Sequence, residues 1–290
     1  RSIEHGVVAA NHKERRKYWK DWENFATNCG VDPKLQRVPE ADKITALTAF
    51  AERIRAGHCG KGKRVRAQTV QVALRAIGTT CELDGLPNPT YRAEGRYLKP
   101  LERQIESFKR EDPPPSHKLA VPVSVVEHLA IVARKTNNPK AHAEANLACI
   151  AFYYLLRVGE YTYHNERAQR HTKQFRAKDV TFWDSQDRQI PNTAPLAQLL
   201  TATSATLSIS NQKNGTRGSL INHEANGELS CPIQAAARQV HHIMQHGSGD
   251  TILGTYFTTK GYRIKVTEAH IGKAIKNAVI ALNLTDKGFP

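Results

Sequence analysis

The chain has 290 residues, of which 42 are Lys or Arg and 27 are Asp or Glu, so its formal net charge is +15 at pH 7. The basic excess is shared by residues 1–112 and 113–290, which excludes a neutral protein with one basic tail. A large polyanion such as nucleic acid is the expected partner, and a merely soluble basic protein is the alternative. The five cysteines are widely spaced and form no C-x-x-C pair, which favours a reduced intracellular protein over a disulfide framework.

Residues 1–112 predict a bundle of four amphipathic helices. The first, residues 11–30, places Tyr18, Trp22 and Phe25 on one face, and Gly30 is a helix stop. The other three predicted helices are residues 44–56, 67–80 and 98–110.

A basic loop, residues 57–66, leads into the third of these helices. Lys61, Lys63, Arg64 and Arg66 lie on this loop and the following helical turn. Basic side chains and free backbone N–H groups at a helix start can both reach phosphates, so these four residues are candidate DNA contacts. A solvated run of charge without function is the alternative.

Three successive prolines follow at residues 113–115, and they restrict the backbone to extended conformations. The segment 112–116 is therefore a predicted stiff linker between two domains, residues 1–112 and 113–290.

In the second domain, residues 184–203 are expected to be an irregular insertion. The predicted helices there are 123–134, 141–163, 232–245 and 268–282, with Thr267 as a cap, and 179–183 is a predicted strand.

The helix predicted over residues 141–163 contains the most apolar stretch of the chain. Residues 145–156 are almost wholly apolar, too short to span a bilayer and too long for a typical strand, and Arg157 follows them. A guanidinium on a buried helix needs an acceptor, and Glu160 at i+3 can bind one edge of it. The other edge is left for a ligand. A structural Arg–Glu pair is the alternative.

Residues 207–222 alternate in polarity on both sides of Asn214–Gly215, the dipeptide that most favours a two-residue hairpin turn. Lys213 lies beside this turn, and Arg217, on the returning strand, is a further candidate DNA contact.

The basic helical domain, the linker, the apolar helix that ends near Arg157 and the hairpin with Lys213 follow one another along the chain. In this order they resemble the tyrosine recombinases, also called phage-integrase-type recombinases, over roughly residues 14–290. The segments L-L-R-V-G-E-Y-T, F-R-A-K-D-V-T-F-W and N-Q-K-N-G-T-R-G look most like copies carried by eukaryotic mobile elements. The resemblance implies a mainly α fold with a small antiparallel β-sheet. The implied fold consists of a helical, SAM-like core-binding domain and an α+β tyrosine-recombinase catalytic domain, which is incomplete at the C-terminus.

The resemblance also implies roles for the site residues. The arginine at the position of Arg157 clamps the scissile phosphate, since its planar fork matches two phosphate oxygens. Lys213 is the general acid toward the leaving 5′ oxygen, Glu160 orients the arginine, and Arg217 is a less suitable donor. The family acts on double-stranded DNA, as a homo-tetramer in the full-length protein.

The sequence departs from the family pattern after residue 262, the last tyrosine. No His-x-x-Arg box and no nucleophilic tyrosine follow it, so the chain is expected to be a fragment that does not cleave DNA alone. His12-x-x-Arg15 and His164-x-x-Arg167 spell the box at other places and are interpreted as coincidences. Tyr161 and Tyr163 are poor nucleophile candidates.

No cofactor is expected, because the sequence contains no Gly-rich phosphate-binding loop of the ATPase type and phosphotyrosyl exchange conserves bond energy. His242 and His246, with His241 beside them, share a predicted helix, but no carboxylate or cysteine stands nearby, so a metal site is not predicted.

Two other hypotheses remain at this point. One is a catalytically inactive DNA-binding relic of a mobile element, and the other is an unrelated basic helical protein that binds RNA or acts as a scaffold. The cellular compartment is not determined by the sequence, and it would be the nucleus if the source is eukaryotic.

Overall fold

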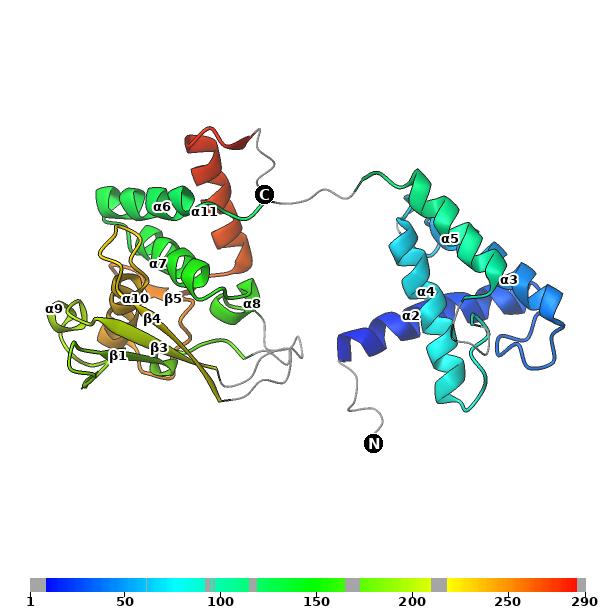
Figure 1. The fold of residues 1–290 in the computed structure, drawn as a ribbon, viewed down its shortest axis with the longest axis horizontal. Helices are drawn as coiled ribbons and strands as arrows, with labels where there is room; N and C mark the ends of the chain where they lie inside the picture. The colour runs from blue at the N-terminus through cyan, green and yellow to red at the C-terminus, as the bar shows by residue number, and fades with distance from the viewer. Residues whose placement is uncertain are drawn as a thin grey trace. The chain divides into compact units, whose positions relative to one another are not determined.

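The structure is a computed structural model that describes residues 9–60, 62–91, 95, 97–114, 119–164, 173–209 and 218–285, with backbone only for residues 9–11. The chain divides into two compact units, residues 1–116 (unit 1) and 117–290 (unit 2). Figure 1 shows the helices of unit 1 in blue to cyan-green, and the mixed helices and strands of unit 2 in green to red.

The described residues of unit 1 form a bundle of four helices, as the sequence predicts. They are α2 (Ala9–Asn28), α3 (Glu40–Arg55), α4 (Ala67–Leu83) and α5 (Lys99–Glu111). The predicted apolar stripe of α2 enters the core, where Trp22 is fully buried and meets Phe50 of α3 edge-on, with ring centroids 5.2 Å apart. Such aromatic contacts add to the burial of apolar area, which stabilises short helices that would be marginal alone.

The other helices that the structure describes, and its strands, belong to unit 2. The helices are α6 (Val123–Thr136), α7 (Pro139–Tyr153), α8 (Val158–Tyr161), the 3₁₀ turn η1 (Ala177–Asp179), α9 (Leu196–Leu199), α10 (Pro232–His246) and α11 (Glu268–Ala281). The strands are β1 (Val180–Trp183), β2 (Gln189–Ile190), β3 (Ser204–Ile209), β4 (Ser219–Glu224), β5 (Thr255–Phe257) and β6 (Arg263–Lys265).

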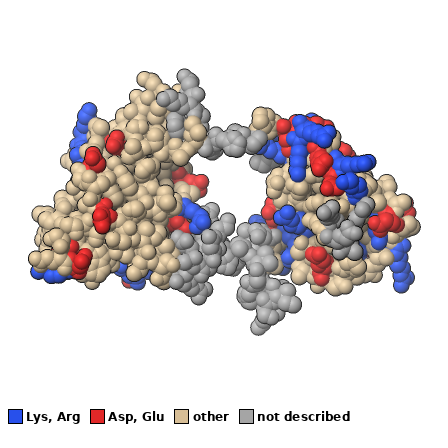
Figure 2. Space-filling view, viewed as in Figure 1, with Lys and Arg blue, Asp and Glu red and all other residues tan. Residues whose placement is uncertain are grey.

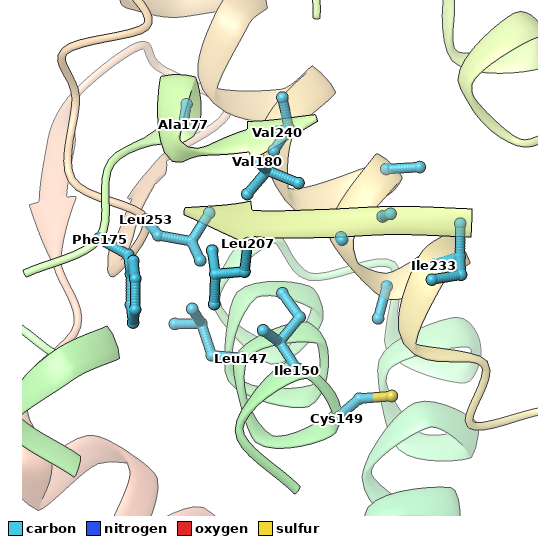
Figure 3. Close-up of a cluster of buried hydrophobic side chains, with 14 of the residues drawn as sticks. Leu147, Cys149, Ile150, Phe175, Ala177, Val180, Leu207, Ile233, Val240 and Leu253 are labelled. Carbon is cyan, nitrogen blue, oxygen red and sulfur yellow. The ribbon is translucent and has the colours of Figure 1, made fainter. Parts of the chain in front are cut away.

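The larger sheet has the strand order β2-β1-β3-β4, and every neighbouring pair is antiparallel. Alternate residues of β3 are buried because one face of this sheet packs on helices and the other does not. Figure 3 shows Leu207 of β3 directed toward Leu147 and Ile150 of α7, in the core cluster of unit 2. The predicted class, mainly helical with a small antiparallel sheet, is confirmed.

Two predictions for unit 2 are wrong in detail. Residues 184–203 are not irregular throughout, because they form β2 and α9, which place Ile190 and Leu199 in the core. In addition, strands β5 and β6, which form an antiparallel pair, were not predicted. The antiparallel pairing of β3 with β4, with Ile209 opposite Ser219, confirms the predicted strand pair, while the predicted turn at Asn214–Gly215 lies outside the described residues.

The five cysteines are free thiols. Among the helices that the structure describes, none is both long enough and apolar enough to cross a membrane.

Candidate phosphate-binding site

The apolar helix α7 ends four residues before Arg157. The predicted continuous helix from Ala141 to Tyr163 is therefore wrong, because the chain turns after Tyr153 and starts the separate short helix α8 at Val158. The Leu156 N–H donates to the carbonyl of Ala151 at 3.0 Å, and Leu155 adopts a left-handed backbone with φ of 52°. This is the pattern of a Schellman-type helix end, which more often uses glycine.

Leu155 is the strained residue of this turn, and its side chain is 87% exposed, so it contributes little packing. We expect Leu155→Gly to raise the free energy of unfolding of unit 2 by about 0.5–1 kcal/mol, because the left-handed conformation costs a residue with a Cβ about 1–2 kcal/mol and glycine's entropy offsets part of the gain. Urea denaturation measures this change. A loss of stability would mean that Leu155 makes contacts not apparent from its exposure.

Arg157 is the N-cap residue of α8, and Glu160 holds it there. The Glu160 carboxylate accepts a hydrogen bond from the Arg157 backbone N–H at 2.8 Å, and its other oxygen lies 3.4 Å from Nη1 of the guanidinium. The Arg157 side chain is 53% exposed, and that of Glu160 is 2% exposed. The predicted pair exists, with the carboxylate buried and the guanidinium reaching solvent.

This arrangement leaves most of the guanidinium available. With the residues that the structure describes, it forms no hydrogen bond other than the long one to Glu160. Glu160 fixes the backbone from which the side chain projects, so less conformational entropy has to be lost when an anion binds. An exposed, weakly paired guanidinium on a fixed backbone is suited to bind a phosphate.

The segment around α8 is attached to two other parts of unit 2. The Phe175 N–H donates to the Glu160 carbonyl at 2.9 Å, and the Tyr163 N–H donates to the Val266 carbonyl at 2.6 Å. A Cβ built on Gly254 would lie 2.5 Å from the Tyr161 carbonyl oxygen, so only glycine allows this approach of the β5 region. The position of Arg157 therefore depends on residues distant in sequence.

Lys265 is a cation near this segment that the sequence analysis missed. Its ammonium lies 3.9 Å from the centroid of the Tyr163 ring, two residues beyond α8. No sequence pattern could have identified it, because Lys265 reaches Tyr163 only through the pairing of the chain near Val266. A second cation close to α8 increases the attraction for anions.

Lys213 and Arg217, the predicted hairpin cations, lie outside the described residues, as does Lys61 of the basic loop. The structure describes the strand ends on both sides of the hairpin tip, and in the view of Figure 1 these ends lie toward the same side of unit 2 as α8.

Two tyrosines close to Arg157 in sequence, Tyr154 and Tyr161, are unsuited to be nucleophiles. Tyr154 and Tyr161 are buried, and the Tyr154 hydroxyl donates to the Ala205 carbonyl at 2.8 Å. Burial raises the pKa of Tyr161 to about 12, and it also raises the pKa of Tyr154. A phenol kept protonated and enclosed cannot attack a DNA backbone.

The basic loop of unit 1 is partly neutralised. Arg64 forms an ion pair with Glu111, and the Ala67 N–H at the start of α4 donates to the Asp112 carboxylate at 2.8 Å. A carboxylate thus already binds the helix start where a phosphate was expected. Lys63 and Arg66 are exposed, and neither forms an ion pair with the described residues. Figure 2 shows blue and red side chains intermixed on the visible face of unit 1.

The remaining histidine patterns are accounted for in part. His12 and Arg15 are hydrogen-bonded to each other at 2.9 Å on α2, and Arg167 lies outside the described residues. The Phe257 N–H donates to Nε2 of His242 at 2.9 Å, so that nitrogen has no lone pair for a metal. The described residues include no group of three or more His, Cys, Asp or Glu placed to hold a metal ion.

No protein-family model matches the chain, and no curated protein matches its sequence. What this site does is therefore inferred from the chain's own residues and their geometry.

Proposed function

We propose that this protein binds duplex DNA through its sugar-phosphate backbone, with Arg157 contacting a phosphate, in the manner of the tyrosine recombinases that its sequence resembles. The observation that supports this most is the half-exposed guanidinium of Arg157, whose backbone is fixed by the buried carboxylate of Glu160. The long contact of 3.4 Å to Glu160 leaves most of the donors of this guanidinium available to a ligand.

The charge of the whole chain favours the same partner. The net charge of +15 attracts a polyanion over long distances, and phosphate contacts supply most of the affinity of such complexes. The two units would correspond to the helical core-binding domain and the α+β catalytic domain of the family. Lys213 would be the general acid on the β3–β4 hairpin, and the family's tetramer on DNA would be the assembly.

Binding without strand cleavage is the second candidate function. Tyr154 and Tyr161 are consistent with it, because both are buried and neither offers the accessible phenol that a phosphotyrosyl intermediate needs. In this candidate the same scaffold binds DNA, and Arg157 positions a phosphate that is not broken.

Fluorescence anisotropy of a labelled DNA duplex tests the proposal with two arginine variants of unit 2. Arg157→Ala should weaken binding about tenfold to a hundredfold, because a charge-assisted hydrogen bond contributes about 1.5–3 kcal/mol. Arg188→Ala removes the same charge from a side chain that is 71% exposed and bonded to Asp184 at 2.9 Å. It should change the affinity about twofold at most at physiological salt.

A labelled RNA hairpin of the same length distinguishes the remaining hypothesis. If the protein bound RNA more tightly than duplex DNA, and Arg157→Ala affected neither, the chain would be a basic RNA-binding or scaffold protein and the proposed function would be wrong. Circular dichroism of each variant shows whether the fold is retained.

A further inference from the structure

A cavity with several polar side chains in its lining lies in unit 2, between α7, α9 and α10. Its volume is about 330 Å³, and a smaller cavity of about 30 Å³ adjoins it beneath α6. The two cavities share three lining residues, His142, Asn146 and Arg238. The remaining polar residues that line them are Arg134, Asn137, Ser230, Gln239, His241, His242 and Gln245. The lining of both cavities therefore contains cations, amides and a hydroxyl, and no carboxylate.

Asn146 indicates that this space is built for a polar ligand. Its side chain belongs to the buried helix α7, the residue is 8% exposed, and it lines both cavities. The carboxamide forms no hydrogen bond with any residue that the structure describes. Because Asn146 faces both cavities and its amide has no partner among the described residues, the amide is free to donate to a bound group.

Arg238 of α10 supplies a permanent charge beside Asn146. It is partly buried, and its guanidinium donates to the Gln234 side-chain oxygen at 2.9 Å, a neutral partner. Burial, and then the neighbouring Arg134, lower the pKa of Arg238, so two guanidinium groups lie close together. Among the described residues no carboxylate forms an ion pair with either arginine. A partly buried arginine without a counter-charge favours the binding of an anion.

The histidines add directed donors to the same cavity. Because His242 Nε2 accepts the Phe257 N–H, the proton of its neutral ring is on Nδ1, which remains a donor. Burial, followed by Arg238 and Arg134, lowers the pKa of His142. The pKa of His242 is lowered by burial first and then by His246, and His142 and His241 lower it further. The charged groups that act on His142, Arg238 and Arg134, are thus both cations.

We infer that this cavity binds a phosphate group, with Arg238 as the main charged contact and Asn146 and His142 as hydrogen-bond donors. The inference does not depend on Arg157, which lies on a different element. The phosphate could belong to a small phosphate compound or to the backbone of a nucleic acid, and the chemistry of recognition is the same in both.

Isothermal titration calorimetry of the full chain with inorganic phosphate, at constant ionic strength, tests the site without DNA. We expect saturable binding with a Kd on the order of 1 mM, and Arg238→Gln should raise the Kd about tenfold or more. His142→Gln, in a partly buried side chain, should weaken binding severalfold while preserving the fold. Arg188→Gln, the matched control outside the cavity, should leave the Kd unchanged.

Two results would overturn the inference. One is the absence of saturable phosphate binding, and the other is an unchanged Kd in the folded Arg238→Gln and His142→Gln variants. Anisotropy with a DNA duplex then identifies the source of the phosphate. If Arg238→Gln weakens phosphate binding and leaves DNA binding unchanged, the ligand is a small phosphate compound. If it weakens both, the cavity binds the DNA backbone. If Arg238→Gln abolished DNA binding and left phosphate binding intact, the cavity would not be a phosphate-binding site.

Discussion

Replacing Arg55 by Met is expected to lower the free energy of unfolding of unit 1 by about 2–3 kcal/mol, because it removes a buried guanidinium and leaves the groups that accept from it without their donor. Arg55 is 4% exposed at the end of α3. It forms an ion pair with Asp112, donates to the Val65 carbonyl at 2.6 Å and donates to the Phe108 carbonyl at 3.0 Å. One guanidinium thus connects the end of α3, the end of the basic loop and the end of α5.

Urea denaturation, followed by Trp fluorescence in the α2–α3 core, measures this loss. Arg53→Met is the matched control, since Arg53 is exposed two residues earlier on the same helix and its replacement should change stability by about 0.5 kcal/mol at most. Equal unfolding midpoints for the two variants would show that Arg55 is not the link between these elements.

Asp112 gives this ion pair a dependence on pH. Burial raises the pKa of Asp112, but the hydrogen bonds from Arg55 and from the Ala67 N–H outweigh it, and the pKa lies below its ordinary value. A carboxylate with a lowered folded pKa stabilises the fold above its unfolded pKa, and this contribution is lost as the pH falls through the folded pKa. The stability difference between the wild type and Asp112→Asn should therefore be constant above about pH 5 and shrink below about pH 4. A difference independent of pH would contradict the ionised pair.

Replacing Glu160 by Ala is the second change with a large expected effect. It should destabilise unit 2 by about 2–3 kcal/mol, because the carboxylate is 2% exposed and its removal leaves the Arg157 N–H without its acceptor and a void around α8. The same change should weaken DNA binding, since the backbone that carries the Arg157 guanidinium would no longer be fixed.

Glu160→Gln separates these two roles. The amide oxygen can still accept from the Arg157 N–H, so most of the stability should be retained, while the attraction to the guanidinium is lost. Thermal unfolding and DNA anisotropy of both variants measure the two effects. If Glu160→Ala lost stability but bound DNA as tightly as the wild type, Glu160 would be a structural residue without influence on Arg157.

The sequence allowed the helices of unit 1 to be predicted because their apolar positions recur at helical spacing, as at Tyr18 and Trp22. It did not show the end of α7, because no Gly or Pro interrupts the apolar run and the left-handed turn is made by a leucine, Leu155. The strand β5 was missed because it has only three residues, all buried, so it shows no alternation. Short elements like this are stabilised by tertiary contacts, such as the bond from Phe257 to His242.

The candidate site was predicted only in part for the same reason. Local spacing was sufficient to pair Arg157 with Glu160, since the two residues are three positions apart. Which of them is exposed depends on the turn at Leu155 and on the distant Gly254 and Val266, which no local pattern contains. Asp112 was assigned to the linker from its prolines, whereas its carboxylate binds two groups of unit 1.

The contact between Arg157 and a DNA phosphate is tested most directly by the salt dependence of binding. Each neutralised phosphate contributes about 0.9 to the slope of log K against log salt for duplex DNA. The slope for Arg157→Ala should be smaller in magnitude than that of the wild type by about 0.9, and Arg188→Ala should keep the wild-type slope. Identical slopes for the wild type and Arg157→Ala would contradict a phosphate contact at Arg157.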